Sequence, residues 1–211
     1  MAGRSSGKSI PNDVPTSRIR LFWIPLGAGG VGFVRLNGRI YELIEALGQR
    51  RSPLDLYHTA LEIRSDDTRW VVENAWPSPD SDFSARGVVV EGPVFNKRLA
   101  RLRPFRYEIR RWQNGVIPDA GAVGTRTELL SADAEVARSV LSLVEEVPPL
   151  VWGRDEMQTG EMWNSNSVIS WLLTRAEFPI DTIHPPEGGR APGWEAGTRI
   201  AGWGQAKSRR N

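Results

Sequence analysis

A chain of 211 residues is long enough for one domain with a full hydrophobic core and too short for two comfortable ones. Its 40% hydrophobic and 25% charged residues are typical of a folded globular protein and exclude a disordered chain. The formal net charge is only +2, and the chain contains no cysteine, which excludes disulfides, thiolate metal sites and thiol catalysis.

The basic excess lies largely at the two ends of the chain. We predict a disordered basic tail over residues 1–18, a single globular domain over residues 19–203 and a second basic tail over residues 204–211. No aromatic side chains interleave with these terminal charges, as a stacking platform for bases would require. We therefore expect no nucleic-acid partner.

The N-terminal segment predicts no targeting or anchoring signal. Residues 1–16 are rich in Ser, Gly, Pro and charge and lack the long apolar region of a signal peptide. The apolar run over residues 21–34 is interrupted by Pro25 and four glycines, so it falls short of a spanning helix. We expect a cytoplasmic protein without a membrane span.

The first apolar segments of the predicted domain favour strands. Residues 19–24 and 32–36 each fit a strand, and Asn37-Gly38 fits a tight hairpin turn because both residue types tolerate positive φ. Residues 39–47 carry apolar residues at a period of about 3.6, which favours a helix, whereas the Asn-Gly turn before them favours a returning strand. Both alternatives remain open.

The strongest hairpin signal joins residues 56–63 to residues 69–75 around a polar turn at residues 66–67. With the turn centred there, His58 and Glu73 lie on the same face of the hairpin and are diagonal neighbours, roughly 7–8 Å apart between backbones. A register shift of one residue would place them on opposite faces.

Two further strands are predicted over residues 87–90 and 105–112, with an arginine-rich connection between them. Residues 117–128 show no regular pattern and are predicted to be irregular. We expect an α+β fold in which an antiparallel sheet packs against a few helices.

Two helices are predicted in the second half of the chain. Ser131 and Glu135 begin a helix whose apolar residues continue to Pro148. The last long helix is predicted over about residues 165–176. Beyond Pro185 the chain is dominated by Gly, Pro and Trp, which predicts ordered coil packed against the domain.

A candidate nucleophile lies at the start of this last helix. Ser165 belongs to the segment Asn164-Ser165-Asn166-Ser167, and unpaired backbone N–H groups together with the positive end of the helix dipole favour a developing anion there. Helical spacing places Ser165 on the apolar side of the helix, so we expect it to point toward the sheet face that carries His58. The alternative is that Asn164 or Ser165 simply caps the helix.

Two other short segments are weaker candidates for ligand sites. Gly27-Ala28-Gly29-Gly30 lacks the Gly-Lys-Ser/Thr ending of a phosphate-binding loop. Asp155 or Glu156 could contact a metal, but no histidine cluster accompanies them, and an ion pair with Arg154 is the simpler alternative. We expect no cofactor and no metal.

The order of these segments resembles the circularly permuted papain-like hydrolase superfamily of permuted NlpC type, which includes PPPDE peptidases and lecithin:retinol acyltransferase-like enzymes. The likeness covers roughly residues 19–178. Ser165 stands where that superfamily commonly has its nucleophilic cysteine, His58 at the position of the base and Glu73 at that of the polar orienter. The resemblance implies a permuted papain-like fold and a hydrolase or acyltransferase that acts on an amide or ester bond.

In such an enzyme Ser165 would attack, and backbone N–H groups near Ser165 and Asn166 would stabilise the oxyanion. Asn164 would be a further donor. Trp163 would lie beside the substrate, and the alternative is that it is a buried core tryptophan. The substrate implied by the resemblance is a peptide, an isopeptide or a lipid-like molecule.

Serine depends on a well-placed general base much more than cysteine does, so a second hypothesis stands beside the first. It is a catalytically inactive papain-like binding or interaction module that uses the same groove for a peptide, a lipid or a protein partner. A nucleic-acid role would require a contiguous arginine stripe across Arg98, Arg101, Arg103 and Arg106.

Overall fold

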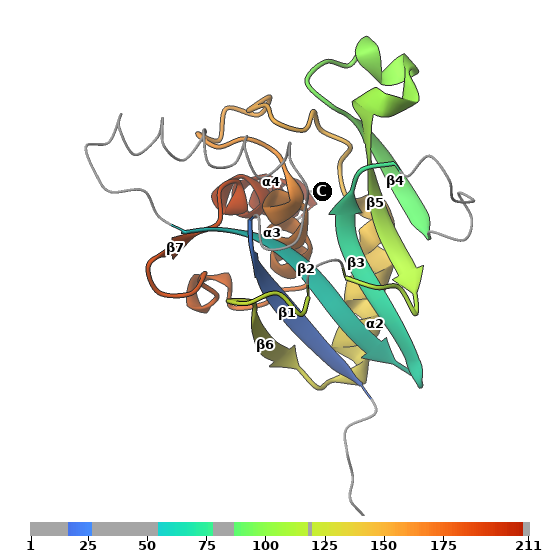
Figure 1. Ribbon diagram of the computed structural model, residues 1–211, viewed down its shortest axis with the longest axis vertical. Coiled ribbons are helices and arrows are strands. Elements are labelled where there is room, and N and C mark those ends of the chain that lie inside the picture. Colours follow the sequence, from blue (N-terminus) through green and yellow to red (C-terminus); the bar gives the residue numbers. More distant parts are fainter. Residues whose placement is uncertain (1–16, 27–54, 78–86, 118–119, 209–211) are drawn as a thin grey trace, which may run out of the picture.

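The computed structural model describes residues 17–26, 55–77, 87–117 and 120–208. These residues form an α+β fold in which an antiparallel sheet is covered by helices (Figure 1). The strands are β1 (Arg18–Pro25), β2 (Asp55–Ser65), β3 (Thr68–Ala75), β4 (Val88–Pro93), β5 (Arg106–Gln113), β6 (Arg126–Ser131) and β7 (Gly189–Arg190). The α-helices are α2 (Ala134–Leu143), α3 (Ser165–Arg175) and α4 (Trp194–Ser208). The short 3-10 helices are η2 (Leu99–Arg101), η3 (Arg103–Phe105), η4 (Val144–Glu146) and η5 (Ile180–Thr182).

The strand order in the sheet is β4-β5-β3-β2-β1-β6, and all of these neighbours are antiparallel. β7 adds a short parallel pairing at the first residues of β2. The β2–β3 register pairs Leu61 with Val72 and Ser65 with Thr68, which confirms the predicted hairpin and its register. Its two turn residues have φ of 48° and 60°, the left-handed conformation that a two-residue hairpin turn requires.

Residues along the central strands alternate between the two faces of the sheet. Leu61 and Val72 pack with the helices in the main hydrophobic core, on the side that we call the helix face. Ala60 and Val71 belong to a separate and smaller cluster on the opposite side, which we call the far face. Both sides of these strands are therefore buried.

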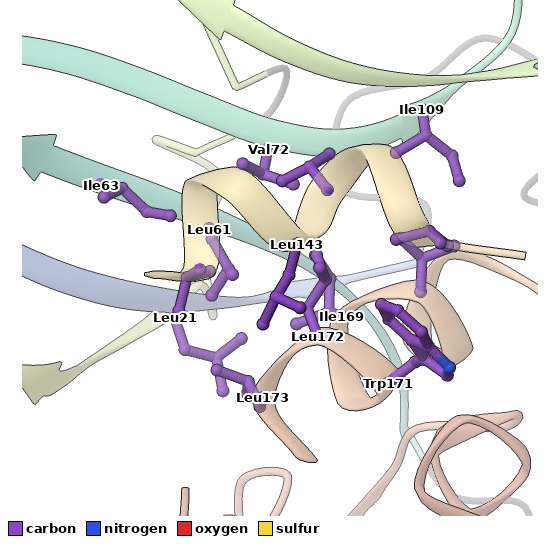
Figure 2. Packing of buried hydrophobic residues seen from close by; sticks show 14 of the residues in the cluster. Leu21, Leu61, Ile63, Val72, Ile109, Leu143, Ile169, Trp171, Leu172 and Leu173 are labelled. Carbon is purple, nitrogen blue, oxygen red and sulfur yellow. The ribbon is translucent and has the colours of Figure 1, made fainter. Parts of the chain in front are cut away.

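The main core lies between the sheet and the helices α2 and α3 (Figure 2). Leu143 of α2 and Ile169 and Leu172 of α3 pack there against inward side chains of the strands. α2 begins at a true N-cap, because Asp133 accepts hydrogen bonds from the backbone N–H groups of the first turn. The helix predicted from Ser131 is thus confirmed, with its start three residues later.

Two elements differ from the sequence-based expectation. β6 occupies part of the segment predicted to be irregular, where it pairs with β1 as an edge strand. The segment predicted as coil after Pro185 instead contains α4, which packs against α3 and places Trp194 5.0 Å from the ring of Trp23. α4 continues to Ser208, so it includes part of the predicted C-terminal tail.

Several predicted features lie outside the described residues. These are most of the N-terminal tail over residues 1–18, the strand over residues 32–36, the Asn37-Gly38 turn and the helix or strand over residues 39–47. Among the described helices, none combines the length and the apolar character needed to cross a membrane.

Candidate functional site

The start of α3 is a complete capping box. Asn164 has extended backbone geometry, and its Oδ1 accepts hydrogen bonds from the N–H groups of Asn166 at 2.9 Å and Ser167 at 3.3 Å. In return, Ser167 Oγ accepts from the N–H of Asn164 at 3.0 Å. These bonds satisfy donors that a helix start would otherwise leave unpaired. Asn164, not Ser165, is the capping residue, and the backbone N–H of Asn166 is already used.

Asn166 joins α3 to two other parts of the chain. Its Nδ2 donates to the backbone carbonyls of Tyr57 at 3.0 Å and Pro192 at 2.9 Å, and its Oδ1 accepts from the hydroxyl of Thr59 at 3.0 Å. The Nδ2 of Asn164 also donates to Pro192 O, at 2.8 Å. The side-chain amides of both predicted oxyanion donors, Asn164 and Asn166, therefore donate to buried backbone carbonyls.

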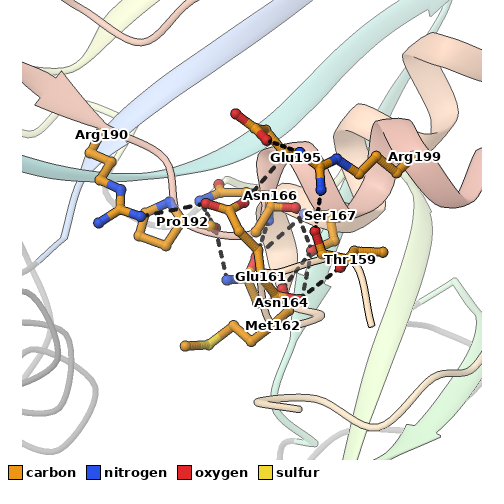
Figure 3. A network of polar contacts seen from close by, with 11 residues as sticks. Thr159, Glu161, Met162, Asn164, Asn166, Ser167, Arg190, Pro192, Glu195 and Arg199 are labelled. Atoms are coloured by element: carbon orange, nitrogen blue, oxygen red, sulfur yellow. Dashed lines mark hydrogen bonds and ion pairs between the residues drawn. The ribbon is translucent and has the colours of Figure 1, made fainter. Parts of the chain in front are cut away.

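The contact between α3 and the segment leading into α4 is close and polar (Figure 3). Ser167 Oγ donates to Gly193 O at 2.8 Å, and Ser170 Oγ donates to Trp194 O at 2.7 Å. A Cβ on Gly197 would come within 2.1 Å of the carbonyl oxygen of Ser167, so the absence of a side chain there permits the approach. This arrangement is a packing interface held together by hydrogen bonds.

Charged groups surround this interface on its exposed side (Figure 3). Arg190 lies 3.6 Å from Glu161, and Arg199 pairs with Glu195 at 2.8 Å. Glu161 also accepts from the backbone N–H of Glu195 at 3.2 Å, close to the start of α4. Burial raises the pKa of Glu161, the hydrogen bond from Glu195 N–H and the charge of Arg190 partly oppose the rise, and the nearby Glu195 carboxylate adds to it. The group acts as a second set of contacts between α4 and the loop before α3.

Ser165 is the first residue of α3 and is half-buried. Among the described residues, its hydroxyl makes no hydrogen bond.

Trp163 is buried in the main core, where its Nε1 donates to the hydroxyl of Tyr107 at 3.2 Å. Of the two alternatives for Trp163, the structure shows the buried core residue and not a side chain beside a substrate.

His58 lies in β2 opposite Ile24 of β1. Ile24 and Ala60 belong to the far-face cluster, so His58, two residues before Ala60, shares the far face. The intervening residue, Thr59, faces α3 and binds it. The structure thus does not bring His58 and Ser165 to one site, contrary to the prediction, because one step along a strand reverses the direction of the side chain.

Glu73 lies on the far face, as the predicted register requires, but its side chain pairs with Arg110 at 3.3 Å. Arg110 also binds Glu108 at 2.8 Å and donates to the carbonyl of Trp76 at 3.0 Å. Burial raises the pKa of Glu73, and the neighbouring Arg110 offsets only part of that rise. Glu73 is thus a member of a buried ion cluster and not the orienter of His58.

The two carboxylates of the loop after Trp152 both bind other groups of the protein. Asp155 accepts from the backbone N–H groups of Thr159 and Gly160, both at 2.8 Å. Glu156 pairs with Lys97 at 2.9 Å, whereas the expected ion-pair partner was Arg154. Within the described part of the chain, no group of three or more His, Cys, Asp or Glu side chains is arranged to hold a metal ion.

A different surface gathers exposed apolar and basic side chains around the half-buried Trp152. The rings of Trp76 and Phe95 both pack edge-on against Trp152, with centroids 5.3 and 6.3 Å away. The connection between β4 and β5 continues from Phe95 into η2 and η3, beyond the end of these two strands (Figure 1). We call this region the tip surface, and it consists of Trp76, Phe95, Lys97, Arg98, Leu99, Arg101, Leu102, Arg103 and Trp152.

The sequence indicated only half of the tip surface. The arginines form a run between two predicted strands, but no local pattern indicates that Trp76 and Trp152, far apart along the chain, contact each other beside them. The contact arises because Trp152 pairs with the end of β4, where its N–H donates to Pro93 O at 2.8 Å.

Searches with this chain found no matching family model, no similar curated protein and no similar solved structure.

Proposed function

We propose that this protein is a non-catalytic binding module whose contact surface is the tip surface. The supporting observation is the exposure of apolar side chains there: four of the nine large hydrophobic side chains that are exposed in the described residues belong to the tip surface. They are Trp76, Phe95, Leu99 and Leu102. Exposed apolar groups that gather in one place, with arginines between them, are typical of interaction sites.

The competing hypothesis is the hydrolase or acyltransferase that uses Ser165, His58 and Glu73 in a permuted papain-like fold. A general base must reach the nucleophile within hydrogen-bonding distance. The binding module is the better-supported alternative because His58 and Ser165 belong to opposite sides of the sheet and Glu73 pairs with Arg110.

The two hypotheses differ in a covalent test. The folded wild-type protein and the variants Ser165→Ala and His58→Ala are treated with a fluorophosphonate, and the adducts are mapped by peptide mass spectrometry. We expect no adduct at Ser165, since His58 lies on the opposite side of the sheet and the Ser165 hydroxyl makes no hydrogen bond to another described residue. An adduct at Ser165 that disappears in the His58→Ala variant would overturn the proposal and favour the hydrolase.

A further inference from the structure

The apolar members of the tip surface are exposed to an unusual degree for large side chains. Relative exposure is 42% for Trp76, 51% for Phe95, 40% for Leu99 and 57% for Leu102. Leu99 and Leu102 are three residues apart in a 3-10 turn that is closed by the hydrogen bond from Leu102 N–H to Leu99 O at 2.9 Å. This hydrogen bond holds the two exposed leucines at the two ends of one short turn.

The charge of the tip surface is uniformly positive. Residues 92–107 contain five basic residues and no acidic residue. Two of the five are paired from outside the segment, Lys97 with Glu156 at 2.9 Å and Arg106 with Glu91 at 3.2 Å. Arg98 and Arg101 are exposed and form no ion pair among the described residues. Their charges remain available to an anionic partner.

The apolar and basic groups alternate along the same turn. Arg98 precedes Leu99, and Arg101 precedes Leu102. The turn lies beyond the end of β4 and β5, where it projects from the body of the molecule (Figure 1). A projecting turn with leucines flanked by arginines suits a partner that is apolar inside and anionic at its surface.

We infer that the tip surface binds a phospholipid bilayer that contains anionic lipid, an inference that rests on the proposed binding function. Leu99, Leu102 and Phe95 enter the boundary between headgroups and acyl chains, while Arg98 and Arg101 bind lipid phosphates. Interfacial proteins combine buried apolar area with attraction to anionic headgroups in this way. A single-stranded nucleic acid fits less well, because bases stack on aromatic rings and would leave both leucines in water.

The inference is tested by flotation of the full-length protein with vesicles. One set is pure phosphatidylcholine, and in the other about a third of the lipid is phosphatidylserine. We expect binding to the phosphatidylserine vesicles only, weakening as salt is added because added ions screen the exposed arginines.

Two double variants separate the apolar and the charged contributions. Leu99→Ser with Leu102→Ser removes the inserted groups, and Arg98→Ala with Arg101→Ala removes the unpaired cations. Each is expected to weaken binding to the phosphatidylserine vesicles by about tenfold or more. The matched control, Arg126→Ala with Leu129→Ser, changes an exposed arginine and an exposed leucine on β6 and should bind like the wild type.

Absence of binding to phosphatidylserine vesicles, or binding that the tip variants do not weaken, would overturn the inference. A single-stranded oligothymidine and a polyglutamate peptide are measured in parallel. If either binds through the same residues while the vesicles do not, the lipid assignment fails and the binding function stands. A His58-dependent adduct at Ser165 would instead remove the proposed function, whatever the vesicle result.

Discussion

The hydroxyl of Thr59 donates a 3.0 Å hydrogen bond to Oδ1 of Asn166, which joins the middle of β2 to the first turn of α3. Both residues are buried, and the same Asn166 side chain donates to carbonyls of two separate segments. The side chain of Asn166, a candidate oxyanion donor, thus holds the helix against the sheet through these hydrogen bonds.

Replacement of Asn166 by leucine should lower the free energy of unfolding by about 2–4 kcal/mol, because buried polar partners on Thr59 and Tyr57 lose their bonds. Urea unfolding measures the loss. In a double-mutant cycle, Thr59→Val should cost less in the Asn166→Leu background than in the wild type. Equal costs in both backgrounds would show that the Thr59–Asn166 bond contributes nothing.

Two serines of the same helix turn should respond differently to replacement by alanine. Ser167→Ala removes a capping partner and the bond to Gly193 O, so it should cost about 1–3 kcal/mol in the free energy of unfolding. Ser165→Ala removes no hydrogen bond among the described residues and should stay within about 0.5 kcal/mol of the wild type. A large loss for Ser165→Ala would point to a structural contact of its hydroxyl that the structure does not contain.

Two glycines of α4 form a second matched pair. A Cβ on Gly197 would lie 2.1 Å from both Ser167 O and Ser170 Oγ, so Gly197→Ala should force α4 away from α3 and cost about 1–3 kcal/mol or more. Gly202 has nothing within 4 Å of an added Cβ, so Gly202→Ala should raise stability by about 0.5–1 kcal/mol through helix propensity. Thermal unfolding of both variants measures the contrast, and equal midpoints would refute it.

The ion cluster of Glu73, Arg110 and Glu108 should depend strongly on its cation. Arg110→Met would remove the cation that the buried carboxylates of Glu73 and Glu108 share, and we expect a loss of about 3–5 kcal/mol in the free energy of unfolding. Glu73→Gln keeps the shape of the side chain and leaves Arg110 paired with Glu108, so it should cost much less. Urea unfolding of the two variants gives the comparison, and a greater loss for Glu73→Gln would contradict it.

Glu73 should also give stability a defined pH dependence. Burial raises its pKa above the ordinary 4.5, so between 4.5 and the raised value the folded state holds a proton that the unfolded state has released. This contribution is fully present below pH 4.5 and is lost as the pH rises through the folded-state pKa. The stability of the wild type relative to Glu73→Gln should therefore fall as pH rises through this window. Parallel curves for the two proteins would exclude a raised pKa.

Much of the sheet could be predicted from local pattern. The β2–β3 hairpin and its register follow from two strand-forming segments around a polar turn, and the register follows from the position of that turn. The side of the sheet on which His58 lies could also be predicted from the sequence. Leu61 and Ile63 alternate with Glu62, which already favours placing Thr59 with the core and His58 on the other side.

The helix at the end of the chain could not be predicted in the same way. α4 contains Gly197, Gly202 and Gly204, and glycine disfavours helix in an isolated segment. Packing against α3 outweighs that cost, and the closest approach occurs at one of those glycines, Gly197. The role of the Asn164–Ser167 segment was hidden for the same reason, since its partners at Pro192 and Gly193 come from that distant segment.

The carbonyls of Pro192, Gly193 and Trp194 complete the hydrogen bonding of α3, which has consequences for the order of folding during synthesis. Strands β1 to β6 and α2 leave the ribosome before the residues that satisfy α3. Until then the growing chain carries apolar strand surface without its final cover, the kind of surface that chaperones bind. The helix α3 is therefore expected to reach its final place on the sheet only after residues 192–194 have left the ribosome.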